Sequence, residues 1–204
     1  MVKSFSTTID FLFLILISGV LILGAGEGSG EIPPLEVIKA SNRQILDIYA
    51  AHETIDEKTE EEIRKIMGSV TDFNEISKRT IERFCRNLSP AECEEFDRVF
   101  QELLRISSIK KLGRYRADRF DYLGEEVAEE RAVVRTTAYY KDDEVSLDYH
   151  LELTEGRWLI VNYIADDVDA IRNYQKQFRR ILNKESFPQL IERLKNKIAE
   201  YKEE

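Results

Sequence analysis

Apolar side chains recur every three or four residues through the first half of the chain, which is the spacing of one buried helix face. This spacing predicts four helices, at residues 34–52, 59–70, 72–87 and 90–113. The fourth helix has the clearest start, because Ser89, Pro90 and Glu92 form a capping box with proline at the first helical position. Behind its N-terminal segment, the chain therefore begins with a group of helices.

After residue 115 the pattern changes to alternation, which is typical of β-strands. It predicts four strands joined by turns short enough for antiparallel neighbours, at residues 115–123, 130–140, 144–154 and 157–165. In the third strand Leu147, Tyr149 and Leu151 share one face, while Asp148 and His150 share the other. One face of the sheet is therefore expected to be wet, with His150 as an exposed surface histidine. The fourth strand is apolar on both faces, which fits a position covered on both sides.

Helical spacing returns at residues 168–183 and 186–201. The predicted fold class is α+β, with N-terminal helices, a curled antiparallel sheet of about four strands and C-terminal helices.

The N-terminus has the features of an export signal. Lys3 precedes an apolar run over residues 11–23, which is shorter than the roughly 20 residues that span a bilayer, and small residues follow at Gly24 and Gly26. We therefore expect a signal peptide at residues 1–26, a linker at 27–34 and a single domain at 35–204. The alternative is an uncleaved segment that anchors the protein in a membrane.

Composition and the absence of motifs argue against several classes of function. The net charge of −9 argues against a nucleic-acid partner. With only two His and two Cys, and without a hydrolase, metalloprotease or phosphate-loop motif, the sequence predicts no metal site, no cofactor and no catalytic residue. Asp166, Asp167 and Asp169 could supply acid–base carboxylates, but a strand end followed by a helix cap explains them better.

The two cysteines lie on either side of the turn at Ser89. Export would permit a bond between Cys85 and Cys93, and so short a loop would stabilise the fold by roughly 2–3 kcal/mol. The alternative is a pair of small core residues on inward helix faces. We favour the disulfide.

Several short motifs follow one another between Phe73 and Leu194. They are Leu88-Ser89-Pro90-Ala91-Glu92 with Phe96 and Phe100 after it, Leu147-Asp148-Tyr149-His150-Leu151, Gly156-Arg157-Trp158, and Asn173-Tyr174-Gln175-Lys176-Gln177-Phe178. In this order and spacing they resemble the MlaC family of periplasmic phospholipid-binding proteins, also described as Ttg2-type toluene-tolerance proteins. Two positions depart from the family. Asp166-Asp167-Val168-Asp169 replaces its E-G-V-S, and Asn162 stands where it often has aspartate.

The resemblance implies a non-enzymatic periplasmic carrier that contributes to outer-membrane lipid asymmetry. It would shuttle phospholipid between an inner-membrane ABC-type lipid transporter complex and an outer-membrane lipoprotein complex, or remain anchored to the inner membrane by an uncleaved signal. Helices and sheet would enclose a deep apolar cavity for the acyl chains. The apolar faces and the resemblance together predict ten lipid-binding residues: Phe100, Leu104, Leu147, Tyr149, Leu151, Ile160, Ile164, Ile171, Tyr174 and Phe178.

Because these faces contain hardly any cation, headgroup recognition is expected to be weak. Two alternatives remain open. One is a small-ligand enzyme or binding module on a similar cone-shaped α+β fold, with carboxylates such as Asp148 or Asp167 facing inward. The other is an envelope adaptor with a filled core.

Overall fold

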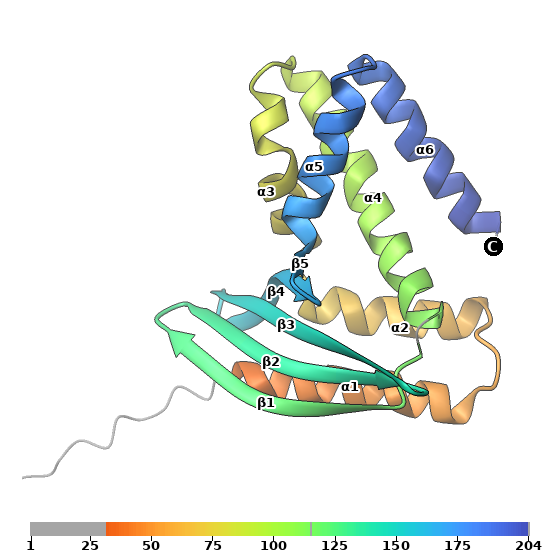
Figure 1. Cartoon of the computed structure of the whole chain (residues 1–204), viewed down its shortest axis with the longest axis vertical. Helices are drawn as coiled ribbons and strands as arrows, with labels where there is room; N and C mark the ends of the chain where they lie inside the picture. The colour runs from red at the N-terminus through yellow and green to blue at the C-terminus, as the bar shows by residue number, and fades with distance from the viewer. Residues whose placement is uncertain (1–31, 115, 204) are drawn as a thin grey trace, which may run out of the picture. The chain divides into compact units, whose positions relative to one another are not determined.

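The computed structural model describes residues 32–114 and 116–203 (Figure 1). The predicted signal peptide and most of the predicted linker lie outside these residues. Residues from Glu31 onward form one compact unit. Within the described ranges, no helix is both long and apolar enough to cross a bilayer.

Six helices are described, and several begin at caps that the sequence supplies. Their bounds are α1 Pro34–Ala51, α2 Glu57–Val70, α3 Phe73–Cys85, α4 Pro90–Arg114, α5 Ala170–Leu182 and α6 Phe187–Glu203. The predicted capping box of α4 is confirmed, because the Glu92 N–H donates to the Ser89 hydroxyl and the Ser89 N–H donates to the Glu92 carboxylate. The Ser89 hydroxyl and the Ser89 N–H both donate to the Glu92 carboxylate, and these two hydrogen bonds lower the pKa of Glu92.

The strands form one antiparallel sheet in the order β1-β2-β3-β4-β5. Their bounds are β1 Arg119–Ala128, β2 Arg131–Tyr140, β3 Asp143–Thr154, β4 Arg157–Ala165 and β5 Val168–Asp169. The two-residue β5 adds a fifth strand to the four that the sequence predicts. Asp166 and Asp167 form the turn before it with φ values of 44° and 63°, the positive values that two-residue hairpin turns require.

The acidic segment at this turn is structural. The side chain of Asp169 accepts a hydrogen bond from the Arg172 N–H and so caps α5, while Asp166 accepts one from the Ser146 N–H. Asp167 occupies a left-handed position, and the resemblance described above expects glycine there. Aspartate tolerates this conformation better than most residues, so the corner survives the substitution.

One face of the sheet packs on α1. Leu151, Trp158 and Ile160 form a core with Ala132 and Val134 of β2 and with the fully buried Ile38 of α1. The sequence does not show which side chains of β2 share this face. In the structure they are Ala132, Val134 and Thr136, which pair with the apolar residues of β3.

The opposite face of the sheet is less exposed to solvent than the sequence predicts. Arg79 of α3 reaches over it and donates to Glu152, and His150 is half-buried between the strands and the helices. The expectation of an exposed His150 is therefore wrong, because alternation within one strand does not reveal that helices partly cover its polar side.

A β-bulge divides the fourth strand. His150 pairs with Asn162 but Leu151 pairs with Ile160, so Val161 is the extra residue. Directly paired residues share a face, which places Ile160 beside Leu151 and Ile164 beside Asp148 on the other side. Simple alternation along β4 would put Ile160 and Ile164 together.

Helices α3 to α6 form a bundle that meets the sheet near β4 and β5 (Figure 1). Phe178 of α5 lies at its centre, with ring centroids 5.2 Å from Phe96 and 5.0 Å from Phe100 in edge-to-face contacts. A disulfide joins Cys85 at the end of α3 to Cys93 in the first turn of α4. Both cysteines pack against this bundle core.

Tyr49 of α1 gives the fold a distinctive response to alkali. Its hydroxyl is buried without a hydrogen-bond partner among the described residues, and burial raises its pKa to about 12, although Arg116 opposes the shift. The folded state holds this proton after the unfolded chain loses it near pH 10, so the titration of Tyr49 leaves stability unchanged below pH 10 and lowers it as the pH rises towards 12.

We expect Tyr49→Phe to stabilise the protein at pH 7 by about 1 kcal/mol, because it removes an unsatisfied buried hydroxyl. The substitution should also reduce the loss of stability between pH 10 and pH 12. Urea unfolding at pH 7 and pH 11 measures both effects. Identical pH dependence in the two proteins would contradict the assignment to Tyr49.

Candidate lipid-binding cavity

A cavity of about 480 Å³ opens between α4, α5, α6 and the end of β4. This volume lies within the range of about 300–1,000 Å³ that is usual for small-molecule sites. Its lining combines apolar walls with a few polar groups: Leu103, Ser107, Tyr163, Ala165, Val168, Ala170, Asn173, Tyr174, Gln177, Phe178, Ile181, Arg193, Leu194, Lys197 and Tyr201.

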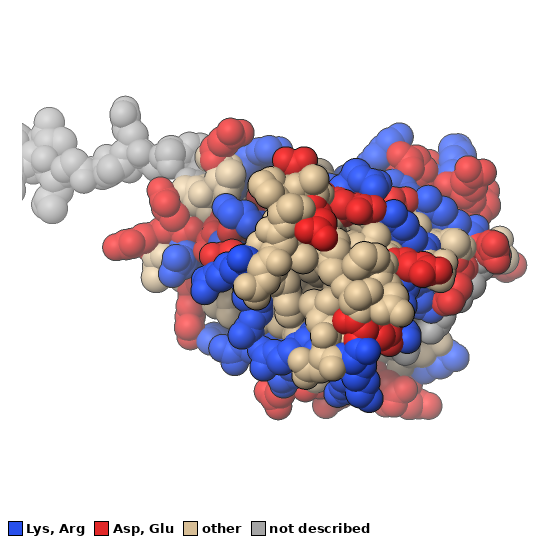
Figure 2. Space-filling view, turned by 90° about the horizontal axis from the view of Figure 1, so that it is seen from above, with Lys and Arg blue, Asp and Glu red and all other residues tan. Residues whose placement is uncertain are grey.

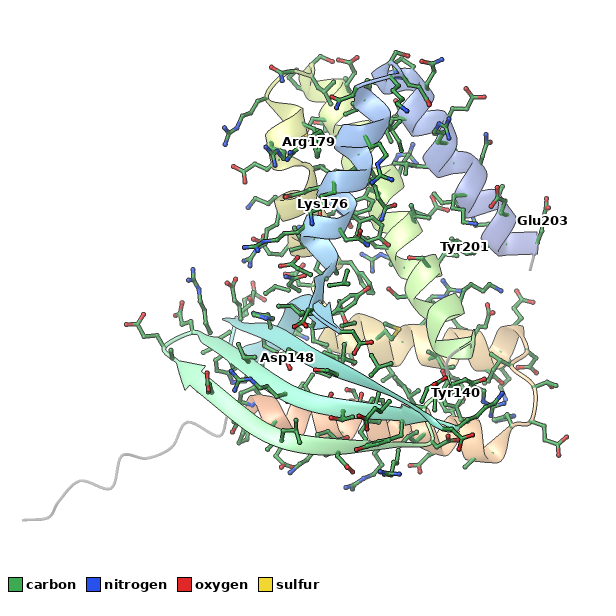
Figure 3. The ribbon with its side chains drawn as sticks, viewed as in Figure 1. Tyr140, Asp148, Lys176, Arg179, Tyr201 and Glu203 are labelled. Atoms are coloured by element: carbon green, nitrogen blue, oxygen red, sulfur yellow. A yellow bond between two sulfur atoms is a disulfide. The ribbon has the colours of Figure 1, made fainter. Side chains whose placement is uncertain are left out.

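Helix periodicity explains how the walls are built. On α5, Ala170, Tyr174 and Phe178 follow one another at intervals of four residues, so they share the side that faces the bundle. The Tyr174 ring packs 5.1 Å from Phe100, and burial raises the pKa of its hydroxyl. On α6, Leu194 and Tyr201 lie two turns apart on the inner side (Figure 3). The α5 wall is thus fixed by the aromatic core behind it.

Polar groups mark the opening of the cavity. Asn173 and Gln177 of α5 and Arg193 of α6 are exposed, and Lys197 of α6 is half-buried. Arg193 donates two hydrogen bonds to Glu185, of 2.6 and 2.7 Å, and these raise its pKa. Lys197 bonds Glu200 at 2.7 Å. The mouth therefore carries cations whose charge is locally balanced.

These two cations correct a premise of the sequence analysis, which expected hardly any positive charge on the lining. The sequence analysis does not assign an inner face to the last helix, α6. Leu190, Leu194 and Ile198 recur at helical spacing, and this signal would have placed Arg193 and Lys197 beside the buried stripe.

The ten predicted lipid-binding residues do not meet in one cavity. Tyr174 and Phe178 line the cavity described above. Phe100 and Leu104 lie in the bundle core, against which Ile171 also packs. Tyr149, Leu151 and Ile160 belong to the separate core between the sheet and α1. Leu147 and Ile164 are half-buried on opposite sheet faces.

Two other pockets are more polar in their lining. One, of about 500 Å³, lies on the sheet face opposite α1 and includes Arg79, Arg131, His150 and Glu152, together with Leu151 and Ile171. The other, of about 400 Å³, is formed only by charged residues and one glutamine of α4. An acyl chain in either would lie against charged groups, so the cavity at α4, α5 and α6 is the better candidate.

The carboxylates that the enzyme alternative invokes lie outside this cavity. Across residues 32–114 and 116–203, no cluster of three or more His, Cys, Asp or Glu could hold a metal ion. Asp148 lies on the sheet (Figure 3), 3.9 Å from Arg135, and neither it nor Asp167 lines the cavity.

Comparisons with known proteins show a shared fold and a shared family. A solved structure of a phospholipid-binding protein from Ralstonia solanacearum, in complex with a phospholipid, matches with a TM-score of 0.66 and 17% identity, over 83% of this chain and 99% of that chain. No curated protein sequence is significantly similar to this chain. The family model described as MlaC protein matches residues 39–196, which is most of the sequence. The chain therefore belongs to the MlaC protein family.

Proposed function

We propose that this protein is a non-enzymatic phospholipid carrier that buries acyl-chain methylenes in the cavity between α4, α5 and α6. The observation that carries the proposal is the apolar wall of this cavity, built on Tyr174 and Phe178, with exposed polar groups such as Asn173 and Gln177 at its mouth. Membership of the MlaC family and the phospholipid bound by the structural neighbour support the choice of ligand.

Phospholipid transfer between membranes has a high free-energy cost unless the acyl chains are covered. Two acyl chains contain about 30 methylenes, and exposing them to water would cost roughly 24 kcal/mol at about 0.8 kcal/mol each. Unaided transfer through water is therefore slow. A protein that covers the chains removes this barrier without any catalytic group, which is consistent with the lining of the cavity.

The cavity has to widen to cover both chains, because a two-chain phospholipid is larger than the small molecules that fit a volume of about 480 Å³. We infer that α6 moves. Outside its apolar contacts, α6 is tied to α4 by the exposed pairs Lys195–Glu95 and Lys202–Glu102, at 2.6 and 2.8 Å. Exposed ion pairs contribute at most about 1 kcal/mol each, so they oppose this movement weakly.

The cellular role follows from the family resemblance. We propose a periplasmic shuttle that exchanges phospholipid with an inner-membrane ABC-type transporter complex and an outer-membrane lipoprotein complex. The predicted export signal supports a location outside the cytoplasm.

Lipid transfer tests the proposal. Protein stripped of lipid is incubated with vesicles that contain a fluorescent phospholipid, separated from them, and analysed for bound lipid. We expect up to one intact phospholipid per protein chain. Protein that takes up no lipid would contradict the carrier function, and recovery of hydrolysed lipid would favour the enzyme alternative.

A further inference from the structure

The outer side of α5 carries an unusual set of charges. Its exposed cations are Arg172, Lys176, Arg179 and Arg180, and no Asp or Glu occurs in the helix from Ala170 to Leu182. Figure 3 shows Lys176 and Arg179 on this helix. Elsewhere charges of both signs mix, and Figure 2 shows Lys and Arg together with Asp and Glu around an uncharged central area of the visible face. A row of like charges in a chain of net charge −9 is therefore a local feature.

Three of these cations have no partner in the part of the chain that the structure describes. Arg172 lies 3.7 Å from the capping carboxylate of Asp169. Among the described residues, Lys176, Arg179 and Arg180 form neither an ion pair nor a side-chain hydrogen bond. On the neighbouring α6, by contrast, the cations at the cavity mouth and along α4 are paired with carboxylates at 2.6–2.8 Å.

Folding does not require this row. The helix dipole favours Arg179 and Arg180 near the C-terminus of α5, but it gives no reason for Lys176 in the middle. The packing of α5 depends on its other side, where Phe178 is buried. Repulsion among unpaired like charges weakens a helix slightly, so the row is better explained by a role outside the fold.

The row is held rigidly next to the cavity mouth. The Gln175 amide donates to the Arg79 carbonyl of α3 at 3.0 Å, which ties α5 to α3. Arg180 lies three residues from Gln177, a residue of the mouth, so the two are neighbours on the helix surface. A partner that contacts the row would therefore lie beside the opening.

We propose that Lys176, Arg179 and Arg180 form a docking surface for an acidic protein surface, which positions the cavity mouth towards a lipid-exchange partner. The partner's role rests on the proposed carrier function, whereas the surface itself is tested separately. Charge complementarity carries the choice of an acidic partner, because each unpaired cation can gain a carboxylate there.

A membrane fits this surface less well. Helices that bind bilayers insert an apolar side, but the apolar side of α5 is buried in the bundle. Among the described residues, the exposed large apolar side chains are Ile32, Leu123, Val127 and Val168, and none of them lies on α5.

Binding of an anionic polypeptide tests the docking surface. The purified protein is titrated with fluorescent poly-L-glutamate at low ionic strength, and α5 is monitored by hydrogen exchange. The test variant combines Lys176→Gln, Arg179→Gln and Arg180→Gln. The matched control combines Arg43→Gln, Lys58→Gln and Lys65→Gln, which neutralise three exposed cations on α1 and α2.

We expect the α5 variant to bind roughly tenfold more weakly, from three lost charge pairs of about 0.5 kcal/mol each, while the control stays close to wild type. Poly-L-glutamate should also protect α5 from exchange. Equal losses in both variants, no binding by the wild type, or stronger α5-dependent binding to phosphatidylglycerol vesicles would overturn the proposal. Lipid uptake by the wild-type protein is measured separately, so the carrier function and the docking surface can fail independently.

Discussion

Replacing Ala165 with tryptophan is expected to reduce phospholipid loading by at least tenfold while the protein stays folded. The Ala165 side chain lines the cavity at the end of β4, so an indole there would occupy space that a lipid chain needs. Excluding only two methylenes removes about 1.6 kcal/mol of binding free energy, which already exceeds a factor of ten. Because the added volume fills an existing cavity, the free energy of unfolding should change by less than about 1.5 kcal/mol.

Ala128→Trp provides the matched control. Ala128 also lies in the sheet, but it lines the pocket that contains Arg79 and Glu152. Vesicle uptake and thermal unfolding are measured for both variants. If Ala128→Trp lost lipid loading while Ala165→Trp loaded normally, the lipid site would lie on the other face of the sheet.

The disulfide should be the largest single covalent contribution to stability. We expect the double variant Cys85→Ala, Cys93→Ala to lose about 2–3 kcal/mol of unfolding free energy, because the bond closes a short loop between cysteines eight residues apart. For a protein of this size the midpoint of thermal unfolding should fall by roughly 5–10 °C. Calorimetry with and without a reducing agent measures the effect.

The reducing agent distinguishes the stability contributed by the disulfide from the stability contributed by side-chain packing. It should lower the melting temperature of the wild type and leave the double variant unchanged. Because both cysteines pack against the bundle core, the variant also loses some apolar contact. A wild type whose bond is fully reduced but whose melting temperature stays constant would contradict the stabilising role.

The helices and strands could be predicted well because their signals are local. The capping box at Ser89 fixes the start of α4, and the strand predicted at residues 157–165 coincides with β4. The bulge at Val161 could not be predicted, because β4 is apolar on both faces and an extra residue leaves the pattern unchanged. The strand β5 was missed since two residues are too few to show a period.

The lining of the cavity was harder to predict than the fold. Phe100 and Leu151 are both apolar residues on inward faces, but they belong to two different cores. A side chain that faces a cavity and one that faces a packed core have the same sequence signal, since both avoid water. Only the arrangement of the helices shows that Tyr174 and Phe178 border open space while Phe100 lies behind them.

The central claim is that the cavity between α4, α5 and α6 holds a phospholipid. Native mass spectrometry of the protein, purified without detergent and then incubated with phospholipid vesicles, tests it most directly. We expect the wild-type mass to increase by one intact phospholipid and the Ala165→Trp variant to carry little or none. A wild-type mass equal to that of the polypeptide alone, before and after incubation, would contradict it.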